Sequence, residues 1–326
     1  MSLAAFDTQH MKNIAQNMRA TQSAFTRFAN AVSQIYERAG LSHPFDINQH
    51  PEIKRAIERE LRKLASGLNR GLVNGINNEW QLSNRKNDWM LGKKLRGRRL
   101  PGMLEEKWMG RNLSALEAFR NRTVNGLNLS DRVWDMARVH GTNMERHLAL
   151  GVYEGRSAKE LAGEIKSALK NPDTLFRRVR DNQGELRLSK AAKEFNPGRG
   201  VYRSAYKNAL RLTRTEINLS YQHADNERWK EMDFVLGVRV ERSNAPYECD
   251  ICEAAVGDYP KWYEWDSLHP SCRCRAVPIL ASDDDFIRSL EAGFEGKSYN
   301  FGGQVQDIPQ SFKDLQENTN YQHYGH

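Results

Sequence analysis

The chain has few cysteines and no long apolar run. Its 326 residues include only four cysteines. No stretch approaches the roughly 18 consecutive apolar residues that indicate a membrane-spanning helix, and the first residues lack the apolar core of a signal peptide. We therefore expect a soluble chain with no membrane partner, assembled in a reducing cytoplasm where free thiols persist.

The motifs of several enzyme classes are also missing. The sequence contains no G-x-S-x-G elbow, no phosphate-binding P-loop, no H-E-x-x-H motif and no dinucleotide-binding glycine fingerprint. Each of these motifs sets a nucleophile, a phosphate cradle or metal ligands at the spacing that its chemistry requires. On this ground we expect a protein that is not an enzyme.

Acidic residues are outnumbered by basic ones. The chain has 49 lysines and arginines against 41 aspartates and glutamates, a formal net charge of +8. This balance favours an acidic partner, nucleic acid first. The basic residues crowd into two regions, 85–99 and 177–214. Within these regions we predict nucleic-acid contacts at Lys93, Lys94, Arg96, Arg98, Arg99, Arg177 and Arg178.

The first basic region is predicted to be a loop. Gly92 and Gly97 interrupt it, Gly102 follows it, and the region has Trp89 within it and Trp80 just before it. In such a loop the Lys and Arg side chains can contact phosphates, and the indole rings can stack on bases. The alternative is a solvated, flexible linker with no ligand.

Two stretches near the N-terminus have the apolar spacing of long helices. Residues 11–35 carry apolar side chains at heptad positions, with Thr21 as the polar exception, and residues 51–76 repeat apolar side chains at helical spacing. Joined by a short loop, the two helices predict a long hairpin. Their apolar stripes either bury each other or leave surface for self-association or another partner.

All four cysteines lie between residues 249 and 274. Cys249 and Cys252 form a C-x2-C pair, and His269, Cys272 and Cys274 form a second group. There are therefore five candidate ligands for the four tetrahedral positions of a structural Zn2+. Strand-like sequences lie on both sides of the cysteines, at 235–240 and 275–280. The resulting order of strand, cysteine pair, loop, second ligand group and strand is ribbon-like.

The metal interpretation leaves alternatives open. We predict Cys249, Cys252 and Cys272 as ligands, with Cys274 or His269 as the fourth. The other possibilities are a pair of disulfides, or reduced cysteines with no ligand role. A reducing cytoplasm argues against the disulfides.

These patterns predict a mainly α fold, α+β overall, with a small zinc-stapled β unit near the C-terminus. The expected segments are a helical hairpin with a basic loop over 1–100, a helical region over 101–234, a β-rich zinc-binding unit over 235–282 and a C-terminal arm over 283–326. The arm after residue 296 is expected to be ordered only when it docks on a neighbour. Arg214 and Glu216, on a predicted helix just before the first strand, are expected to form a polar brace between helix and ribbon.

Three motifs follow one another along the chain. They are Leu212-Thr213-Arg214-Thr215-Glu216-Ile217-Asn218, then Cys249-x2-Cys252, then His269-Pro270-Ser271-Cys272-Arg273-Cys274. This order closely resembles the Mu F-like minor head proteins of tailed bacteriophages, which end in an R-T-E helix, a C-x-x-C and an HP-x-CRC before a short apolar strand. The resemblance covers roughly residues 125–280.

The resemblance implies a virion structural protein, carried in few copies inside the phage head near the portal. Its implied role is head morphogenesis and the packaging or ejection of the genome. The implied partners are the portal protein, the major capsid or scaffold proteins and the double-stranded DNA genome. The implied locations are the virion and, during assembly, the host cytoplasm. We further expect the hairpin over residues 11–76 to tether the chain to the portal.

Two alternatives remain. Mu F-like modules are sometimes fused to ADP-ribosyltransferase and other toxin domains, but the Ser-Thr-Ser strand of such a transferase is absent here, and Glu58-Arg59-Glu60 lies in a predicted helix. The second alternative is a basic, zinc-containing nucleic-acid-binding protein outside any phage. A portal gene and a scaffold or capsid gene on either side would favour the head protein.

Overall fold

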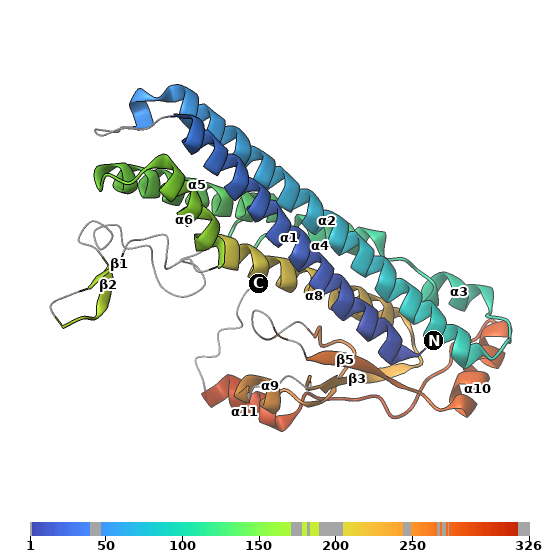
Figure 1. Ribbon diagram of the computed structural model, residues 1–326. Coiled ribbons are helices and arrows are strands. Elements are labelled where there is room, and N and C mark those ends of the chain that lie inside the picture. Colours follow the sequence, from blue (N-terminus) through green and yellow to red (C-terminus); the bar gives the residue numbers. More distant parts are fainter. Residues whose placement is uncertain are drawn as a thin grey trace. The chain divides into compact units, whose positions relative to one another are not determined.

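The computed structural model shows a mainly α-helical chain with a small antiparallel sheet near the C-terminus, as the sequence predicts (Figure 1). It describes residues 2–39, 47–170, 178–180, 183–188, 205–243, 249–265, 268, 272 and 274–318. Within these residues, none of the helices combines the length and the apolar character that crossing a bilayer requires.

The secondary structure begins with two long helices. They are α1 (Leu3–Ala39) and α2 (Pro51–Leu95), with the 3-10 turn η1 (Ile47–Gln49) between them. The middle of the chain contains α3 (Gly102–Trp108), α4 (Leu113–Asn121), α5 (Leu129–Tyr153), α6 (Ala158–Lys170), the strand pair β1 (Arg178–Arg180) and β2 (Leu186–Leu188), and α8 (Ala205–Glu231). The C-terminal part contains β3 (Val235–Glu241), α9 (Asp250–Ala254), β4 (Gly257–Tyr259), β5 (Arg275–Leu280), α10 (Asp283–Phe294) and α11 (Gln310–Asn318).

The chain forms two compact units. Unit 1 comprises Met1–Ala15, Val73–Gly126 and Arg214–His326, and unit 2 comprises Gln16–Leu72 and Leu127–Thr213. Helices α1, α2 and α8 each pass from one unit into the other. The predicted boundaries near residues 100, 234 and 282 instead divide the chain into consecutive segments. The two units differ from the predicted segments because each unit is defined by contacts between stretches that are distant in the sequence.

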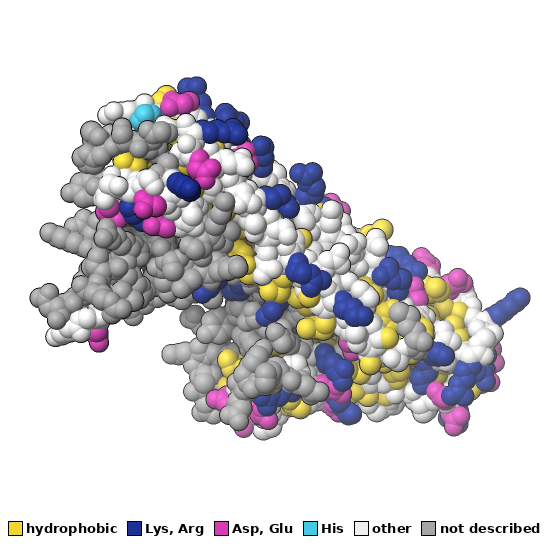
Figure 2. All heavy atoms as spheres, viewed as in Figure 1, with side chains coloured by type: hydrophobic (Ala, Val, Ile, Leu, Met, Phe, Trp, Pro, Cys, Tyr) yellow, Lys and Arg dark blue, Asp and Glu magenta, His cyan; other side chains and the backbone are white. Residues whose placement is uncertain are grey.

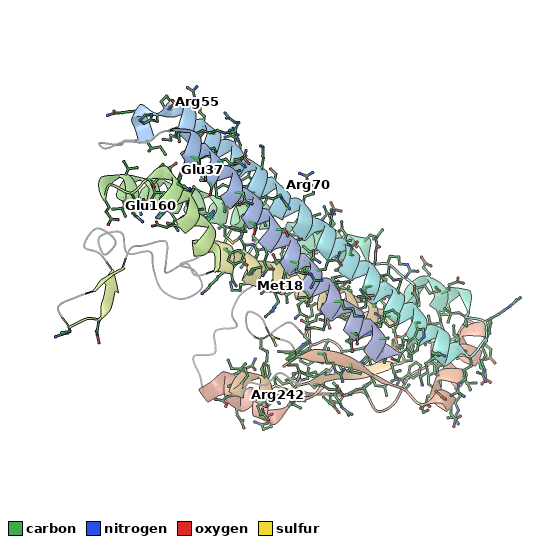
Figure 3. All side chains as sticks on the ribbon, viewed as in Figure 1. Met18, Glu37, Arg55, Arg70, Glu160 and Arg242 are labelled. Atoms are coloured by element: carbon green, nitrogen blue, oxygen red, sulfur yellow. The ribbon has the colours of Figure 1, made fainter. Side chains whose placement is uncertain are left out.

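The apolar stripes predicted for α1 and α2 are buried in unit 2. Phe25 and Val32 on α1 and Ile57 on α2 have no exposed surface. Arg55 and Arg70 are exposed and point outward from α2 (Figure 3). The apolar side chains of these stripes therefore form an intramolecular core in unit 2. Self-association through the N-terminal helices stays a prediction.

The predicted loop over residues 85–99 is wrong for most of its length, because α2 continues to residue 95. Met90 and Leu91 are buried and continue the packed face of the helix. Gly92 within an exposed turn costs the helix only about 1 kcal/mol relative to alanine. The helix ends just before Gly97, whose φ of 83° lies in the left-handed region.

The C-terminal sheet has the strand order β4-β3-β5, with both pairings antiparallel. Strands β3 and β5 confirm the two strands predicted beside the cysteines, whereas the short strand β4 was not predicted. Val238 in the central strand pairs with Tyr259 on one side and with Pro278 on the other. Pro278 is tolerated because β5 is an edge strand, where a missing backbone N–H does not break the sheet.

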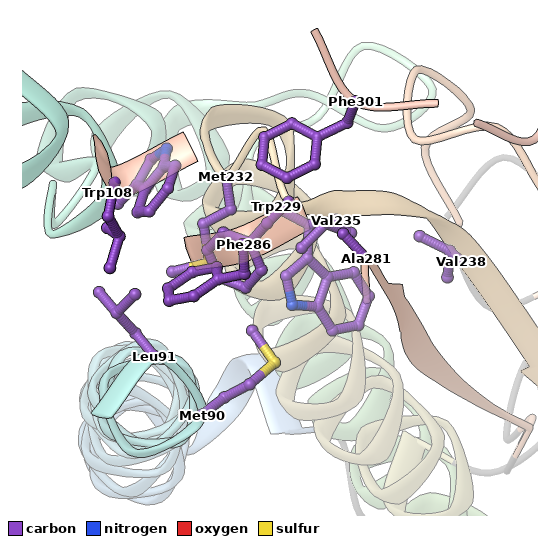
Figure 4. Close-up of a cluster of buried hydrophobic side chains, with 12 residues drawn as sticks. Met90, Leu91, Trp108, Trp229, Met232, Val235, Val238, Ala281, Phe286 and Phe301 are labelled. Atoms are coloured by element: carbon purple, nitrogen blue, oxygen red, sulfur yellow. The ribbon is translucent and has the colours of Figure 1, made fainter. Parts of the chain in front are cut away.

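A cluster of aromatic side chains joins the end of α8 to the sheet in unit 1 (Figure 4). Trp229 of α8 and Phe234 before β3 pack with Trp108 of α3 and Phe286 of α10. The Trp108 ring centroid lies 4.9 Å from that of Phe234 and 5.8 Å from that of Phe286. Each buried aromatic removes roughly 150–250 Å2 from water, so this cluster fixes the end of α8 against the sheet.

The tail belongs to unit 1 and is not a free arm. The Val305 N–H donates to the Leu236 carbonyl oxygen at 3.0 Å. Phe312 on α11 is fully buried in the cluster that contains Tyr259 and Trp265. The predicted arm, ordered only on a neighbour, is therefore wrong for residues 296–318, while residues 319–326 lie outside the described part of the chain.

Gly237 of β3 is expected to tolerate no side chain. A Cβ built there meets Val305 Cγ2 at 2.5 Å and the Tyr259 carbonyl oxygen at 2.8 Å, and that oxygen cannot move without disturbing the β3–β4 pairing. We expect Gly237→Ala to lower the free energy of unfolding by about 1–3 kcal/mol in urea denaturation. The control is Gly92→Ala, whose Cβ meets open space and which should stabilise the helix by up to about 1 kcal/mol. Equal stability of the two variants would contradict this packing.

Candidate metal centre

Three buried thiols converge in unit 1. The sulfur atoms of Cys252, Cys272 and Cys274 all lie within 4.8 Å of one another, and those of Cys252 and Cys272 are 3.9 Å apart. A disulfide bond is only about 2.05 Å long, and the three cysteines are free. Two thiolates on one tetrahedral Zn2+, each at about 2.3 Å, lie roughly 3.8 Å apart. The thiols are therefore placed to hold a metal ion.

The sulfur-bearing segments are short and are held by their surroundings. Cys252 lies on α9, and Cys249 precedes this helix and accepts the Glu253 N–H at 2.9 Å through its carbonyl oxygen. Cys272 and Cys274 precede β5. The apolar shell of the thiols consists of Val240, Ala255, Tyr259, Trp265, Leu268 and Phe312. This shell excludes water from the sulfur atoms.

Three side-chain amides on α8 donate to the backbone that carries or flanks these cysteines. The bonds run from Asn218 to the Cys272 carbonyl oxygen at 3.4 Å, from Gln222 to that of Cys274 at 3.2 Å, and from Asn226 to that of Trp265 at 2.9 Å. Residues four apart share one face of a helix. Sequence reasoning missed this row of amides, although polar residues spaced by four were the signal that could have found it.

Burial and mutual contact raise the pKa of two of the three thiols. The hydrogen bond with Cys272, followed by burial, raises the pKa of Cys252, and the same two causes raise the pKa of Cys274. The Ser243 backbone N–H donates to the Cys274 sulfur and acts in the opposite direction, lowering that pKa. A metal cation would stabilise the thiolates, so binding at this site would release protons.

The structure brings together three of the five predicted ligands. Cys274 is in the close group, whereas Cys249 is half-buried and outside it. Cys249 has extended backbone angles, φ −148° and ψ 103°, and is the N-cap residue of α9. Its thiol still hydrogen-bonds with that of Cys252. His269 lies outside the described residues.

The predicted brace at Arg214 and Glu216 has a different partner. Glu216 is fully buried and accepts a hydrogen bond from Arg122 at 2.8 Å. The Arg122 guanidinium also lies 3.7 Å from the centre of the Phe119 ring. Glu216 therefore braces α8 against the segment after α4, and the α8 amides contact the backbone of Cys272 and Cys274. Arg214 is half-buried.

Two of the predicted nucleic-acid contacts have an acidic partner within the chain. Lys94 and Arg96 pair with Asp283 at 2.8 and 2.5 Å. The hydrogen bond from Lys94, followed by the charges of Lys94 and Arg96, lowers the pKa of Asp283. Arg98 and Arg99 are exposed. Among the described side chains on the face seen in Figure 2, basic and acidic ones are interspersed.

The remaining predicted nucleic-acid contacts are Lys93, Arg177 and Arg178. Lys93 is exposed in the last turn of α2. Arg178 begins β1 and is in register with Leu188 of β2. Arg177 lies outside the residues that the structure describes.

The three thiols of Cys252, Cys272 and Cys274 are the candidate metal site in the described part of the chain. No other set of three or more His, Cys, Asp or Glu side chains there is close enough to share a metal ion. It is held by α8 on one side and by apolar side chains on the other. Comparison with known protein families, with curated proteins and with solved structures found no match.

Proposed function

We propose that the three thiols, with a fourth donor from Cys249 or His269, hold a structural Zn2+. Thiolate donors favour zinc over hard cations such as Mg2+ and Ca2+. The burial of the thiols favours a closed structural site over a catalytic one, which keeps a position open for substrate or water. The observation that carries the proposal is the convergence of Cys252, Cys272 and Cys274 within 4.8 Å.

In this proposal the metal ties α9 to the segment before β5, and amides of α8 hold the backbone of that segment. Asn218 and Gln222 hold the carbonyl groups of Cys272 and Cys274. Partners that orient a ligand residue in this way raise the affinity of a site for its metal. The metal, the amide face of α8 and the sheet would then fold as one unit, because a site of this kind does not exist in the unfolded chain.

We further propose that the chain is a structural protein of a tailed-phage head, of the Mu F-like type. What supports this is the ordered set of motifs together with one contact: α8, which carries the R-T-E sequence, also holds the backbone of Cys272 and Cys274. The helix that carries one motif thus contacts the backbone of another. The proposed partners are the portal protein, the capsid or scaffold proteins and the packaged DNA.

Mass spectrometry of purified phage particles tests this function. We expect the chain in DNA-filled particles, at a copy number far below that of the major capsid protein. It should resist added protease until the heads are opened, because the proposal places it inside. Particles that yield portal peptides but no peptide of this chain would contradict the proposal. That result would favour the alternative, a zinc-containing nucleic-acid-binding protein.

The DNA contact makes a separate prediction at Arg98 and Arg99, which are exposed. If both contact phosphates, replacing them with glutamine should reduce the slope of log K against log salt by about 0.9 for each lost contact. The control replaces Arg55 and Arg59, which are equally exposed on α2, and should leave the slope unchanged. Fluorescence anisotropy with duplex DNA over a salt series measures both. Identical slopes in all three proteins would mean that Arg98 and Arg99 do not contact DNA.

A further inference from the structure

The first turns of α1 are connected to the candidate metal centre through His10. The His10 Nε2 atom lies 2.9 Å from the Asn218 side-chain oxygen on α8. The side-chain nitrogen of the same Asn218 donates to the Cys272 carbonyl oxygen at 3.4 Å. All three residues belong to unit 1. These two hydrogen bonds form a relay from a residue near the start of the chain to the backbone of a proposed metal ligand.

The chemistry of the three groups fixes the direction of both bonds in the relay. A backbone carbonyl oxygen can only accept, so Asn218 turns its NH2 group toward Cys272 and its oxygen toward His10. The His10 Nε2 atom therefore carries a proton and donates it. The opposite orientation of the Asn218 amide would place its oxygen against the Cys272 carbonyl oxygen. His10 thus favours the one orientation of Asn218 that holds the metal-site backbone.

The His10 ring is itself held on three sides. Its Nδ1 atom lies 2.6 Å from one carboxylate oxygen of Glu79 on α2. Asn13 donates to the other Glu79 oxygen at 2.7 Å and so fixes that carboxylate. The face of the His10 ring stacks on Tyr221, with ring centroids 4.2 Å apart. These contacts keep the Nε2 atom pointed at Asn218.

The members of the relay have little contact with water. Glu79 has no exposed surface, and His10, Asn218 and Cys272 are 6%, 6% and 3% exposed. In such surroundings a hydrogen bond is stronger than in water, and connected bonds strengthen one another. A buried amide that loses its acceptor or donor is left unsatisfied. Removal of the His10 ring is therefore expected to free the Asn218 amide to turn away from Cys272.

We infer that His10 is a positioning residue of the metal centre and couples the first turns of α1 to the metal. This inference rests on the proposed zinc site. Loss of an outer partner that orients a ligand residue weakens metal binding by about 10–100-fold. Coupling of this kind is reciprocal, so a metal that binds more tightly when α1 is docked also strengthens the docking of α1.

Zinc release from the full, reduced, zinc-loaded chain to a chelating dye tests the role of His10. We expect His10→Ala and Asn218→Ala each to speed release about tenfold. Because both break the same relay, the double variant should release zinc no faster than Asn218→Ala alone. Gln222→Ala breaks the separate bond to the Cys274 carbonyl oxygen, so its effect should multiply with that of His10→Ala.

Two further variants distinguish positioning from a general loss of packing. Asn13→Ala removes another α1 side chain bound to Glu79 and should leave the release rate unchanged. His10→Gln keeps a donor directed at Asn218 and should restore most of the slow release. Wild-type release from His10→Ala, or effects of His10→Ala and Asn218→Ala that multiply, would overturn the inference.

Alkylation of Cys272 in the metal-free, reduced chain tests the relay without zinc. Trypsin cuts after Arg273 and separates Cys272 from Cys274, so mass spectrometry follows Cys272 alone. His10→Ala should speed its alkylation by about threefold or more, because local opening exposes the thiol, and Asn13→Ala should not. A wild-type chain that holds no zinc would contradict the proposed function, whereas equal alkylation of His10→Ala and the wild type would overturn the relay.

Hydrogen exchange of the wild-type chain needs no change at His10, so it covers the case in which His10→Ala does not fold. Amides of α1 around His10 should exchange about threefold faster, or more, once zinc is removed. In Asn218→Ala, which cuts the relay, zinc removal should no longer change them. An equal effect of zinc in both proteins would overturn the coupling of α1 to the metal.

Discussion

Replacing Cys272 with serine is expected to release the proposed zinc ion and to unfold the part of unit 1 that contains the sheet β4-β3-β5. Cys272 lies next to both other thiols, so its loss leaves at most two of the three grouped donors. Zinc contributes an apparent 10–16 kcal/mol, roughly, in small structural sites, which is comparable with the whole stability of a typical domain, about 5–15 kcal/mol. Zinc content should fall from about one per chain to nearly none.

The matched control for this variant is Ser311→Ala. The Ser311 hydroxyl donates to the Ala254 carbonyl oxygen at 2.8 Å, beside α9, without being a ligand. Its removal should cost about 1 kcal/mol and leave the zinc in place. Elemental analysis gives the zinc content, and near-ultraviolet circular dichroism reports on buried Tyr259 and Trp265. A Cys272→Ser protein with full zinc content and an unchanged spectrum would rule out a zinc role for these thiols.

Asp225→Asn is expected to lower the free energy of unfolding by about 3–5 kcal/mol, because breaking one side of a buried ion pair leaves the other charge uncompensated. The Lys86 and Asp225 side chains are 5% and 4% exposed. Asp225 also accepts hydrogen bonds from Ser83 at 2.6 Å and Asn87 at 2.9 Å. The substitution therefore disturbs a whole polar network between α2 and α8. Urea denaturation measures the loss.

Two comparisons identify the cause of that loss. Lys86→Met combined with Asp225→Asn removes both charges and should be more stable than Asp225→Asn alone. Asp135→Asn breaks a surface pair with Arg138, in which the side chains are 51% and 74% exposed, and should cost no more than about 1 kcal/mol. If Asp225→Asn costs as little as this surface control, the buried pair does not stabilise unit 1 as described.

The features that the sequence predicts correctly are those with a local signal. The heptad spacing of residues 11–35 and the apolar repeat after Pro51 predict α1 and α2, because a helix brings residues three and four apart onto one face. Likewise Cys249-x2-Cys252 and Cys272-x-Cys274 each place sulfur atoms within a few residues. The strands beside them follow from short apolar runs.

What the sequence does not predict depends on pairs of distant residues. Lys86 belongs to a basic run that looks solvated, yet it pairs with Asp225, 139 residues away. Glu216 pairs with Arg122, 94 residues away. The α8 amides donate to backbone carbonyl groups that lie 54, 52 and 39 residues away. Only the folded chain decides which polar side chains meet.

The two-unit arrangement also changes what a truncation would do. His10 on α1 contacts Glu79 on α2 and Asn218 on α8, and Asn218 in turn holds the Cys272 carbonyl group. The first 80 residues thus contribute to the unit that carries the thiols. Their deletion is expected to damage that unit, so it cannot serve to test a portal tether. The tether role of the hairpin stays a prediction.

X-ray absorption at the zinc edge, on protein purified under reducing conditions, tests the central claim most directly. The account predicts about one zinc per chain, with three or four sulfur neighbours at about 2.3 Å. Three sulfurs and one nitrogen would identify His269 as the fourth ligand, and four sulfurs would identify Cys249. A well-folded, reduced chain without zinc, or with zinc bound mainly by oxygen and nitrogen, would contradict the account.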